Sequence, residues 1–392
     1  MIELDLFDPA PPFRFDGILD TRRTPKGMRV SRLPGWAQAQ IVDPGFTWAA
    51  GVPSGARLVS VTDSTSVELD VQLLRLRFGD RDLAPAAFDL VVDGELRDVR
   101  YSNSGHVATY DGRDLSTMRL VRGDGDTIRF DGLGAGEKLL EVWLPHNASL
   151  DIRALRVDDG ASVRIPEPDT RRRWVHYGSS ISHCTEADRP TGVWPVVAAR
   201  LADVDLMSFG LAGQAQLDQV VARTIRELPA DIISLKVGIN VVNGDTMRER
   251  TFVPAVHGFL DTIRDGHPST PIAVITPIVC PAVEDHPGPT LSRPDGDIYV
   301  MDRAPELMTG SLTLSRIREL LAAVVVQRAG AGDENLHVMN GLDLFGASDV
   351  ADLPDGLHPN AAGYQRMGER FYALAFSPDG VFAESARSSQ PI

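Results

Sequence analysis

Apolar and polar residues alternate along the first part of the chain. In residues 67–73 the sequence Val-Glu-Leu-Asp-Val-Gln-Leu places an apolar side chain at every second position, which is the pattern of a strand with one buried face. Residues 88–92, 127–130 and 139–144 continue this pattern, and turns rich in Gly and Asp separate them. Short strands with such turns, without a long helical period, predict an all-β sandwich over residues 1–165.

The pattern changes after the Pro-Glu-Pro sequence at residues 166–168. From there, short apolar runs alternate with segments in which apolar residues recur at the spacing of a helix. The five predicted strands cover residues 174–177, 205–209, 232–237, 272–276 and 336–338. The predicted helices cover residues 194–201, 217–228, 252–263, 312–329 and 360–376. This alternation predicts an α/β domain over residues 166–376, with a five-stranded parallel sheet covered on both faces.

Two segments fit neither pattern. Residues 279–310 are rich in Pro, Gly and Asp and are too long for an ordinary connection, so we predict a lid or a substrate loop there. Residues 377–392 are predicted to form a mobile tail. The sequence therefore predicts two domains followed by a tail.

The composition narrows the classes of function. The chain has 392 residues, with 39 Lys and Arg against 54 Asp and Glu, so its net charge is −15. This acidity argues against a nucleic-acid partner, because phosphate binding depends on clustered basic residues. No apolar stretch is long enough to span a bilayer, and the first residues do not resemble a signal peptide. With only two cysteines, Cys184 and Cys280, these features predict a cytoplasmic protein without a membrane partner or a disulfide framework.

Small polar residues and glycines follow the predicted strands. Ser180 follows the first strand, Gly213 the second and Asn240 the third, while Asp355 and His358 lie beyond the fifth. Ligands of open parallel sheets bind beyond the carboxyl ends of the strands, so we predict that these residues meet at one edge. Taken singly, each has a simpler explanation. A Gly-Ser-Ser sequence is usually only a turn, and Asp355 can cap a helix beside a surface His358.

The combination of these residues predicts acyl transfer. That chemistry needs a hydroxyl nucleophile, a base that takes its proton, a group that orients the base, and donors for the oxyanion. Ser180, His358 and Asp355 can fill the first three roles in that order. The predicted oxyanion donors are the backbone N–H groups of Ser180 and Gly213 and the side-chain amide of Asn240.

At these positions the sequence resembles the SGNH hydrolases, also called the GDSL esterases and lipases, over roughly residues 172–376. Residues 178–182, Gly-Ser-Ser-Ile-Ser, are similar to the Gly-Asp-Ser-Ile-Thr block of that family. Residues 211–214, 238–240 and 355–359 are similar to its glycine, Gly-x-Asn and Asp-x-x-His blocks. The resemblance implies a three-layer α/β/α fold, a Ser180–His358–Asp355 triad, and oxyanion donors at Gly213 and Asn240.

Two positions depart from the family pattern. Ser179 stands where the family has Asp, and Val241 stands where an Asp often follows the Asn. Neither position has a catalytic role in the family. The implied chemistry is therefore unchanged, while the support around the nucleophile differs.

The layout of the whole chain resembles a narrower group, the salicylyl acyltransferases of tetracycline tailoring. In that group a β-sandwich similar to carbohydrate-binding modules precedes the SGNH domain. The resemblance implies ping-pong transfer of an acyl group, salicylyl for example, from a coenzyme A thioester to a hydroxyl of a small molecule such as a tetracycline-type polyketide. Ser180 would carry the acyl group, coenzyme A would be a co-substrate, and no bound cofactor is implied.

Two other functions stay open at this point. One is an SGNH esterase that hydrolyses carbohydrate or lipid esters, with the sandwich as an aid in glycan binding. The other is a non-catalytic binding protein that carries a relic site. Both share the predicted fold, so the sequence pattern alone leaves all three in place.

Three further groups of residues each have two interpretations. Residues 183–188 contain His, Cys, Glu and Asp, but their spacing fits no standard zinc pattern, so they are predicted to be pocket wall and no metal is expected. The three arginines of residues 171–173 form either a solvated linker or a contact with an anionic donor. Trp36, Trp48 and Trp143 are either core residues of the sandwich or a surface on which a sugar stacks.

Overall fold

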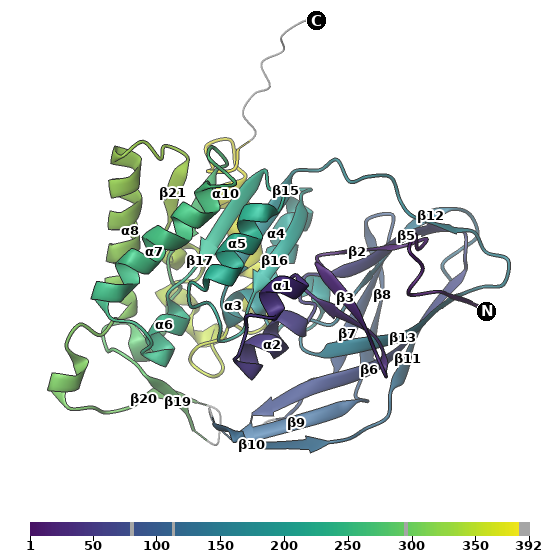
Figure 1. Ribbon diagram of the computed structural model, residues 1–392, viewed down its shortest axis with the longest axis horizontal. Coiled ribbons are helices and arrows are strands. Elements are labelled where there is room, and N and C mark those ends of the chain that lie inside the picture. Colours follow the sequence, from purple (N-terminus) through teal and green to yellow (C-terminus); the bar gives the residue numbers. More distant parts are fainter. Residues whose placement is uncertain (79–81, 112–113, 294–296, 384–392) are drawn as a thin grey trace, which may run out of the picture.

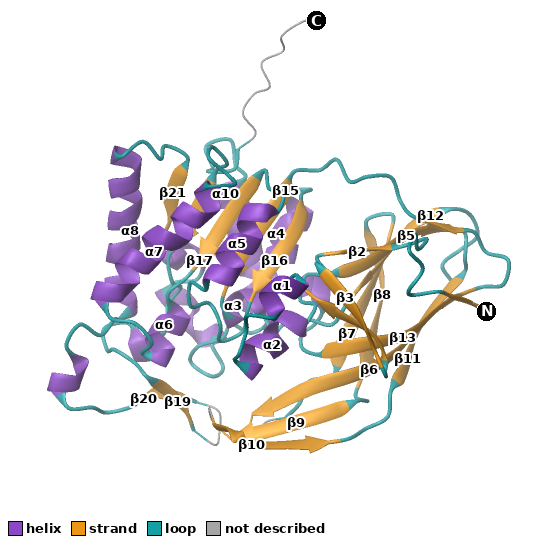
Figure 2. Cartoon of the chain, in the orientation of Figure 1, coloured by secondary structure: helices purple, strands orange, loops and turns teal. Residues whose placement is uncertain are grey.

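The computed structural model describes residues 1–78, 82–111, 114–293 and 297–383. Within these ranges, strands of the first part of the chain form two sheets, and helices surround a third sheet in the second part (Figure 1, Figure 2). The third sheet is parallel and has five strands. The predicted fold class, an SGNH-type α/β domain preceded by a β-rich region, is confirmed.

The larger sheet of the N-terminal sandwich has the order β10-β9-β6-β13-β4-β3, with β1 paired to β13 and β11 paired to β6 in the described residues. Its strands are β1 (Ile2–Leu4), β3 (Asp20–Thr24), β4 (Gly27–Ser31), β6 (Ser66–Phe78), β9 (His106–Asp111), β10 (Asp114–Val121), β11 (Asp126–Asp131) and β13 (Ser149–Val157). The second sheet has the order β14-β5-β12-β7-β8, with β2 paired to β5. Its strands are β2 (Arg14–Asp16), β5 (Arg57–Thr62), β7 (Ala86–Val92), β8 (Glu95–Ser102), β12 (Lys138–Trp143) and β14 (Val163–Arg164).

The alternating pattern of β6 explains how the two sheets pack. Val67, Leu69, Val71 and Leu73 are buried in one apolar cluster, which also contains residues of β7 and β12. Since successive side chains of a strand point to opposite faces, every second residue of β6 enters this core. The two sheets therefore bury their apolar faces against each other.

Two short helices, which the alternating pattern did not predict, follow β4. They are α1 (Gly35–Gln38) and α2 (Pro44–Gly51). The side chain of Asp43 accepts a hydrogen bond of 2.8 Å from the backbone N–H of Phe46, and Pro44 occupies the first turn of α2. Asp followed by Pro is a sequence signal for the start of a helix. Phe46 and neighbouring residues of these helices are buried in the same cluster as the α/β core.

The parallel sheet has the order β16-β15-β17-β18-β21. Its strands are β15 (Arg173–Gly178), β16 (Asp205–Gly210), β17 (Ile232–Lys236), β18 (Ile272–Ile275) and β21 (Leu336–Met339). The helices of this part are α3 (Ser180–His183), α4 (Trp194–Leu201), α5 (Gln219–Glu227), α6 (Ile239–Gly244), α7 (Glu249–Arg264), α8 (Leu314–Gly330), α9 (Gly341–Leu344) and α10 (Ala361–Ala375). Short 3₁₀ turns cover Pro190–Gly192, Pro281–Val283, Pro305–Met308 and Ala347–Asp352.

Helices cover both faces of the parallel sheet. α4 packs against α10, whereas α7 packs against α5 and α8, so the helices form two separate layers. The central strands β17 and β18 are buried along their whole length. The strand order reverses between β15 and β17, which both lie at the middle of the sheet. Such a reversal opens a crevice at the carboxyl ends of the strands, where ligands of this type of sheet bind.

The two irregular segments have defined structure in the described residues. Residues 279–310 contain a hairpin of β19 (Thr290–Ser292) and β20 (Ile298–Val300). The backbone N–H of Ile298 donates to the carbonyl oxygen of Asp355 at 3.1 Å, so the hairpin borders the predicted catalytic loop. At the start of the predicted mobile tail, Phe382 is buried, and its ring contacts the ring of Phe371 edge-on and lies tilted against the ring of Phe376. Residues 384–392 lie outside the described ranges, so the mobile tail stays a prediction.

Candidate active site

Ser180 lies at the carboxyl edge of the parallel sheet, on the first residue of α3. Strand β15 ends at Gly178, and the side chain of Ser179 then accepts a hydrogen bond from the N–H of Ile181 at 3.3 Å. Ser179 thus provides the N-cap of this short helix, a position that Asp also fills well. A Cβ atom at Gly178 would lie 2.2 Å from the hydroxyl of Ser182, so only glycine lets the helix turn back this closely over the strand.

Ser180, His358 and Asp355 form a continuous chain of hydrogen bonds. The Oγ of Ser180 lies 2.9 Å from Nε2 of His358. The Nδ1 of the same ring lies 2.7 Å from Oδ2 of Asp355. With Asp355 ionised, Nδ1–H donates to the carboxylate, which leaves Nε2 as the acceptor for the serine hydroxyl. The geometry fits a base that takes the proton of Ser180.

The carboxylate of Asp355 is held by its own loop. Oδ1 accepts the backbone N–H groups of Leu357 at 2.9 Å and His358 at 2.7 Å. Burial acts to raise the pKa of Asp355, but the bonds and charge of His358 and the bond from Leu357 outweigh it and lower the pKa to about 2. Asp355 is therefore ionised at neutral pH and fixed toward the imidazole ring.

Gly213 lies in the turn after β16, which we call the β16 turn (residues 211–214). The backbone N–H of Gln214 donates to the carbonyl of Leu211 at 3.0 Å, and Gly213 has a φ of +73°. A turn with positive φ at its third position favours glycine. A Cβ at Gly213 would meet no atom within 4 Å, so its backbone borders open space.

Asn240 lies in α6, after β17, and is buried. Its Oδ1 accepts the backbone N–H of Ala215 at 2.9 Å, immediately after the β16 turn. This bond fixes which side of the amide carries the NH₂ group. The first residue of a helix has no partner for its N–H within the helix, and Ser180 occupies that position in α3. The N–H of Ser180, the β16 turn and the Asn240 amide are thus the groups that would supply oxyanion donors.

A second carboxylate, which the sequence did not single out for catalysis, lies near the imidazole of His358. Oε1 of Glu186 is 3.9 Å from Nδ1 of His358, further than the carboxylate of Asp355. Its other oxygen accepts the hydroxyl of Tyr364, in α10, at 2.9 Å. Sequence spacing gives no signal for this contact, because Glu186 and Tyr364 are 178 residues apart.

A buried histidine, His176, also connects α3 to the parallel sheet. The ring of His176 in β15 contacts the hydroxyl of Ser182 at 2.8 Å and the hydroxyl of Ser234 at 2.7 Å. Burial, with a smaller contribution from Lys236, lowers the pKa of His176 to about 3, so the ring is neutral near pH 7. His176 therefore links the nucleophile helix to strand β17.

The structure also shows the positions of residues 183–188 and of the three arginines at residues 171–173. His183 and Cys184 are buried next to Ser180, and no group of three His, Cys, Asp or Glu in the described ranges could hold a metal ion. Arg171 pairs with Asp169 at 2.6 Å and Arg173 with Asp231 at 3.0 Å. These arginines precede or begin β15, at the sheet edge opposite to Ser180. This placement favours the interpretation as a solvated linker, and the contact with an anionic donor stays a prediction.

The three tryptophans do not share one surface. Trp143 is buried, with the guanidinium of Arg57 at 4.9 Å from its ring. Trp36 is exposed and faces Arg223 in α5. Trp48 lies in α2 and stacks on the imidazole of His183.

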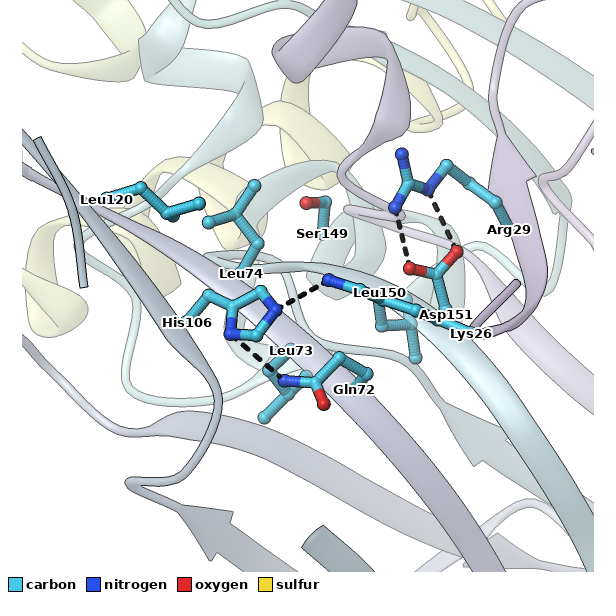
Figure 3. A pocket seen from close by; sticks show the side chains of 10 residues that line it. All are labelled: Lys26, Arg29, Gln72, Leu73, Leu74, His106, Leu120, Ser149, Leu150 and Asp151. Atoms are coloured by element: carbon cyan, nitrogen blue, oxygen red, sulfur yellow. Dashed lines mark hydrogen bonds and ion pairs between the residues drawn. The ribbon is translucent and has the colours of Figure 1, made fainter. Parts of the chain in front are cut away.

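A hollow of about 140 Å³ lies on the larger sheet of the sandwich, and none of the three tryptophans lines it. In Figure 3 the ring of His106 lies between the side chains of Lys26 and Gln72, beside the ion pair of Arg29 and Asp151. Its lining comes from β4, β6, β9, β10 and β13 and the turn before β4, so it does not contain the residues around Ser180.

Among the helices of the described ranges, none combines the length and the apolar character that a membrane span needs.

The comparisons with known proteins agree with this geometry. The model of the GDSL-like lipase/acylhydrolase family matches residues 171–374. Among curated proteins, no sequence matches the chain. Among solved structures, the salicylyl-acyltransferase SsfX3 from a tetracycline biosynthetic pathway is 26% identical, with a TM-score of 0.77 over 94% of this chain and 95% of that one.

Two further solved structures share the fold. A putative GDSL-like lipase from Bacteroides ovatus is 20% identical, with a TM-score of 0.64 over 92% of this chain and 94% of that one. A family two carbohydrate esterase from Clostridium thermocellum is 15% identical, with a TM-score of 0.59 over 92% of this chain and 96% of that one. The family match covers more than half of the chain and includes every residue of the hydrogen-bonded chain at Ser180. The chain therefore belongs to the GDSL-like lipase/acylhydrolase family and is a serine acyltransferase or esterase.

Proposed function

We propose that the protein is an acyltransferase that moves an acyl group from a coenzyme A thioester to a hydroxyl of a small molecule in the cytoplasm. Ser180 is the nucleophile, His358 the base and Asp355 the group that orients the base. The observation that carries this proposal is the hydrogen-bonded chain from Ser180 Oγ through His358 to Asp355, with distances of 2.9 and 2.7 Å.

The first half of the reaction acylates Ser180. Its oxygen attacks the carbonyl carbon of the thioester while His358 Nε2 takes the hydroxyl proton. The negative oxygen that forms is stabilised by the N–H groups of Ser180 and Gly213 and the amide of Asn240. The carbon–sulfur bond then breaks, and the imidazolium returns its proton to the leaving sulfur, which gives acyl-Ser180 and free coenzyme A.

The second half transfers the acyl group. His358 takes the proton of the acceptor hydroxyl, whose oxygen attacks the acyl carbon. The bond to Ser180 Oγ breaks, and the proton passes from His358 back to the serine oxygen. Water can follow the same path, so transfer depends on holding the alcohol in place while limiting access of water.

Two observations favour transfer over hydrolysis. The salicylyl-acyltransferase and the carbohydrate esterase both match nearly the whole chain, but the acyltransferase is more similar, with 26% against 15% identity and a TM-score of 0.77 against 0.59. Two elements near Ser180 can also contribute to an acceptor pocket, because β20 borders Asp355 and α2 places Trp48 against His183. A donor and an acceptor of small size are the expected partners, with no resident cofactor.

The proposal is tested by following acyl-enzyme formation and its partition. Purified protein is incubated with a salicylyl-coenzyme A thioester, and acyl-Ser180 is sought by mass spectrometry, with Ser180→Ala as the control. We expect an adduct only in the unsubstituted protein, and faster release of coenzyme A when a polyketide alcohol is added.

Each other outcome identifies one of the alternatives. Rapid hydrolysis of acetylated sugars without any acceptor, together with free acid as the only product from thioesters, would identify an esterase. Failure of a fluorophosphonate to label Ser180 would contradict both enzymatic functions and leave a non-catalytic binding protein.

A further inference from the structure

His183 is the last residue of α3 and is fully buried, three residues after the nucleophile. Its Nδ1 accepts the backbone N–H of Ala212, in the β16 turn, at 3.3 Å. Its Nε2 lies 2.9 Å from the carbonyl oxygen of His146. One ring therefore joins the N-terminal part of the chain to the turn that contains Gly213.

These two contacts fix the proton of the ring. A backbone N–H can only donate, so Nδ1 must be the nitrogen without a proton, and Nε2–H donates to the carbonyl of His146. Burial is the main cause that lowers the pKa of His183 well below its ordinary value. The charges of Arg32 and His146 lower this pKa further, whereas backbone hydrogen bonds with His146 and Gly210 act to raise it. A single neutral tautomer is thus imposed, and it presents one acceptor to the turn.

Residues of the first 150 positions hold this ring in place. The indole of Trp48 stacks on it with 5.7 Å between the ring centres and an angle of 5° between the planes. The hydroxyl of Ser54 donates to the carbonyl of His183 at 2.8 Å, and Nε2 of His146 donates to the carbonyl of Ala187 at 2.9 Å. The ring is therefore clamped by one face, by one edge and through its own backbone.

Strand β16, which leads into the turn, is held from the same side. The buried guanidinium of Arg32 donates to the carbonyl of Ser208 at 3.0 Å and to the carbonyl of Ala49 at 2.6 Å. Burial lowers the pKa of Arg32 to about 9, so this side chain remains charged at neutral pH. The strand end and the turn after it are both tied to the segment that contains α2.

From these contacts we propose that His183 is a positioning residue of the oxyanion hole. Clamped by Trp48, Ser54 and His146, it fixes the N–H of Ala212 and so sets the direction of the next N–H, that of Gly213. The N-terminal part of the chain thereby acts on catalysis through this ring. The inference rests on the proposed role of Gly213 as an oxyanion donor.

The two hydrogen bonds of His183 can be tested separately. In His183→Asn the side-chain oxygen can occupy the place of Nδ1 and accept from Ala212, while the donor to His146 is lost. In His183→Gln the amide nitrogen can occupy the place of Nε2 and donate to His146, while the acceptor for Ala212 is lost. The two variants are matched in polarity and differ in which neighbour they keep.

The measurements are kcat and KM on p-nitrophenyl acetate and the rate at which a fluorophosphonate labels Ser180. A misplaced oxyanion donor stabilises the transition state less but does not change the binding of the ester. We therefore expect kcat to fall while KM stays constant. We expect His183→Gln to lower kcat and the labelling rate by about 10- to 100-fold, below the loss for deleting a donor outright. In His183→Asn, kcat and the labelling rate should fall by less than about 5-fold. In both variants, KM should stay within about 3-fold of the value for the unsubstituted protein.

Equal losses in the two variants, or no loss in either, would overturn the inference. Thermal unfolding by circular dichroism checks that both variants fold. If either does not, Trp48→Leu provides the test: it removes the stacking and keeps both hydrogen bonds, and an unchanged kcat there counts against the clamp. If the unsubstituted protein is not labelled at Ser180, the proposed function fails. If it is labelled and the variants match it, only the inference fails.

Discussion

The two sides of Ser180 are assembled in different ways. On the triad side, Asp355 and His358 lie three residues apart in one loop, and their mutual bonds are local. On the oxyanion side, the β16 turn is held by Asn240 and His183, and His183 is held in turn by residues of the N-terminal part, such as Ser54, 129 residues away in sequence. The base can therefore be set by a short stretch of chain, whereas the donors that face the oxyanion depend on how the two parts of the molecule pack.

The largest expected effect concerns the two carboxylates on the triad side. Asp355→Asn removes the charge that fixes the tautomer of His358, and a loss of about 1,000- to 10,000-fold in kcat is expected. Glu186→Gln changes the carboxylate at 3.9 Å, which is beyond hydrogen-bond distance, and should cost less than about 10-fold. Steady-state kinetics on an ester substrate compare the two. A larger loss in Glu186→Gln would assign the orienting role to Glu186.

On the oxyanion side, Asn240→Ala should lower kcat by about 100- to 1,000-fold, because one donor to the oxyanion is removed. Asn240→Asp is the matched variant. It keeps an oxygen to accept the N–H of Ala215 and replaces the NH₂ group with a second oxygen. We expect at least the same loss, measured as kcat with KM in parallel. Activity retained in Asn240→Asp would show that Asn240 supports the turn and does not contact the oxyanion.

The same comparison explains which parts could be predicted from the sequence. The five strands of the parallel sheet were located to within one residue at each end, because strands buried on both faces are continuous apolar runs. The triad residues were predicted from a spacing that is local for Asp355 and His358 and from their place after strands. These signals depend on neighbours in sequence and on the edge of one sheet.

The residues that were missed depend on contacts between distant segments. Helix α2 has eight residues, too few for its apolar spacing to stand out, and only Asp43 and Pro44 gave a signal. The role of His183 requires that Trp48, His146 and Ala212 converge on one ring, which no spacing in the sequence expresses. At the start of the predicted tail, the carbonyl oxygen of Phe382 likewise accepts a hydrogen bond from Arg172, which lies 210 residues away in the sequence.

The oxyanion side also gives a pH dependence of stability. Burial lowers the pKa of His146 to about 4, whereas an unfolded histidine titrates near pH 6.5. Because the unfolded state binds the proton first, stability is complete above about pH 6.5 and falls toward pH 4, by about 1.4 kcal/mol per pH unit for each such histidine. His146→Gln should lower this slope by about one proton, measured by urea unfolding across that range. An unchanged slope in His146→Gln would show that His146 does not contribute to this pH dependence.

The smallest effect is expected at a charge remote from both sides. Arg171→Glu reverses a charge near the start of β15, and the six residues of that strand separate it from Gly178 by roughly 20 Å. The KM for the thioester should therefore stay within about 2-fold, with a loss of stability of about 1 kcal/mol from the broken pair with Asp169. Kinetics with the thioester and urea unfolding measure both. A KM raised several-fold would require a donor that reaches the start of β15, whereas an unchanged KM would exclude Arg171 from donor recognition.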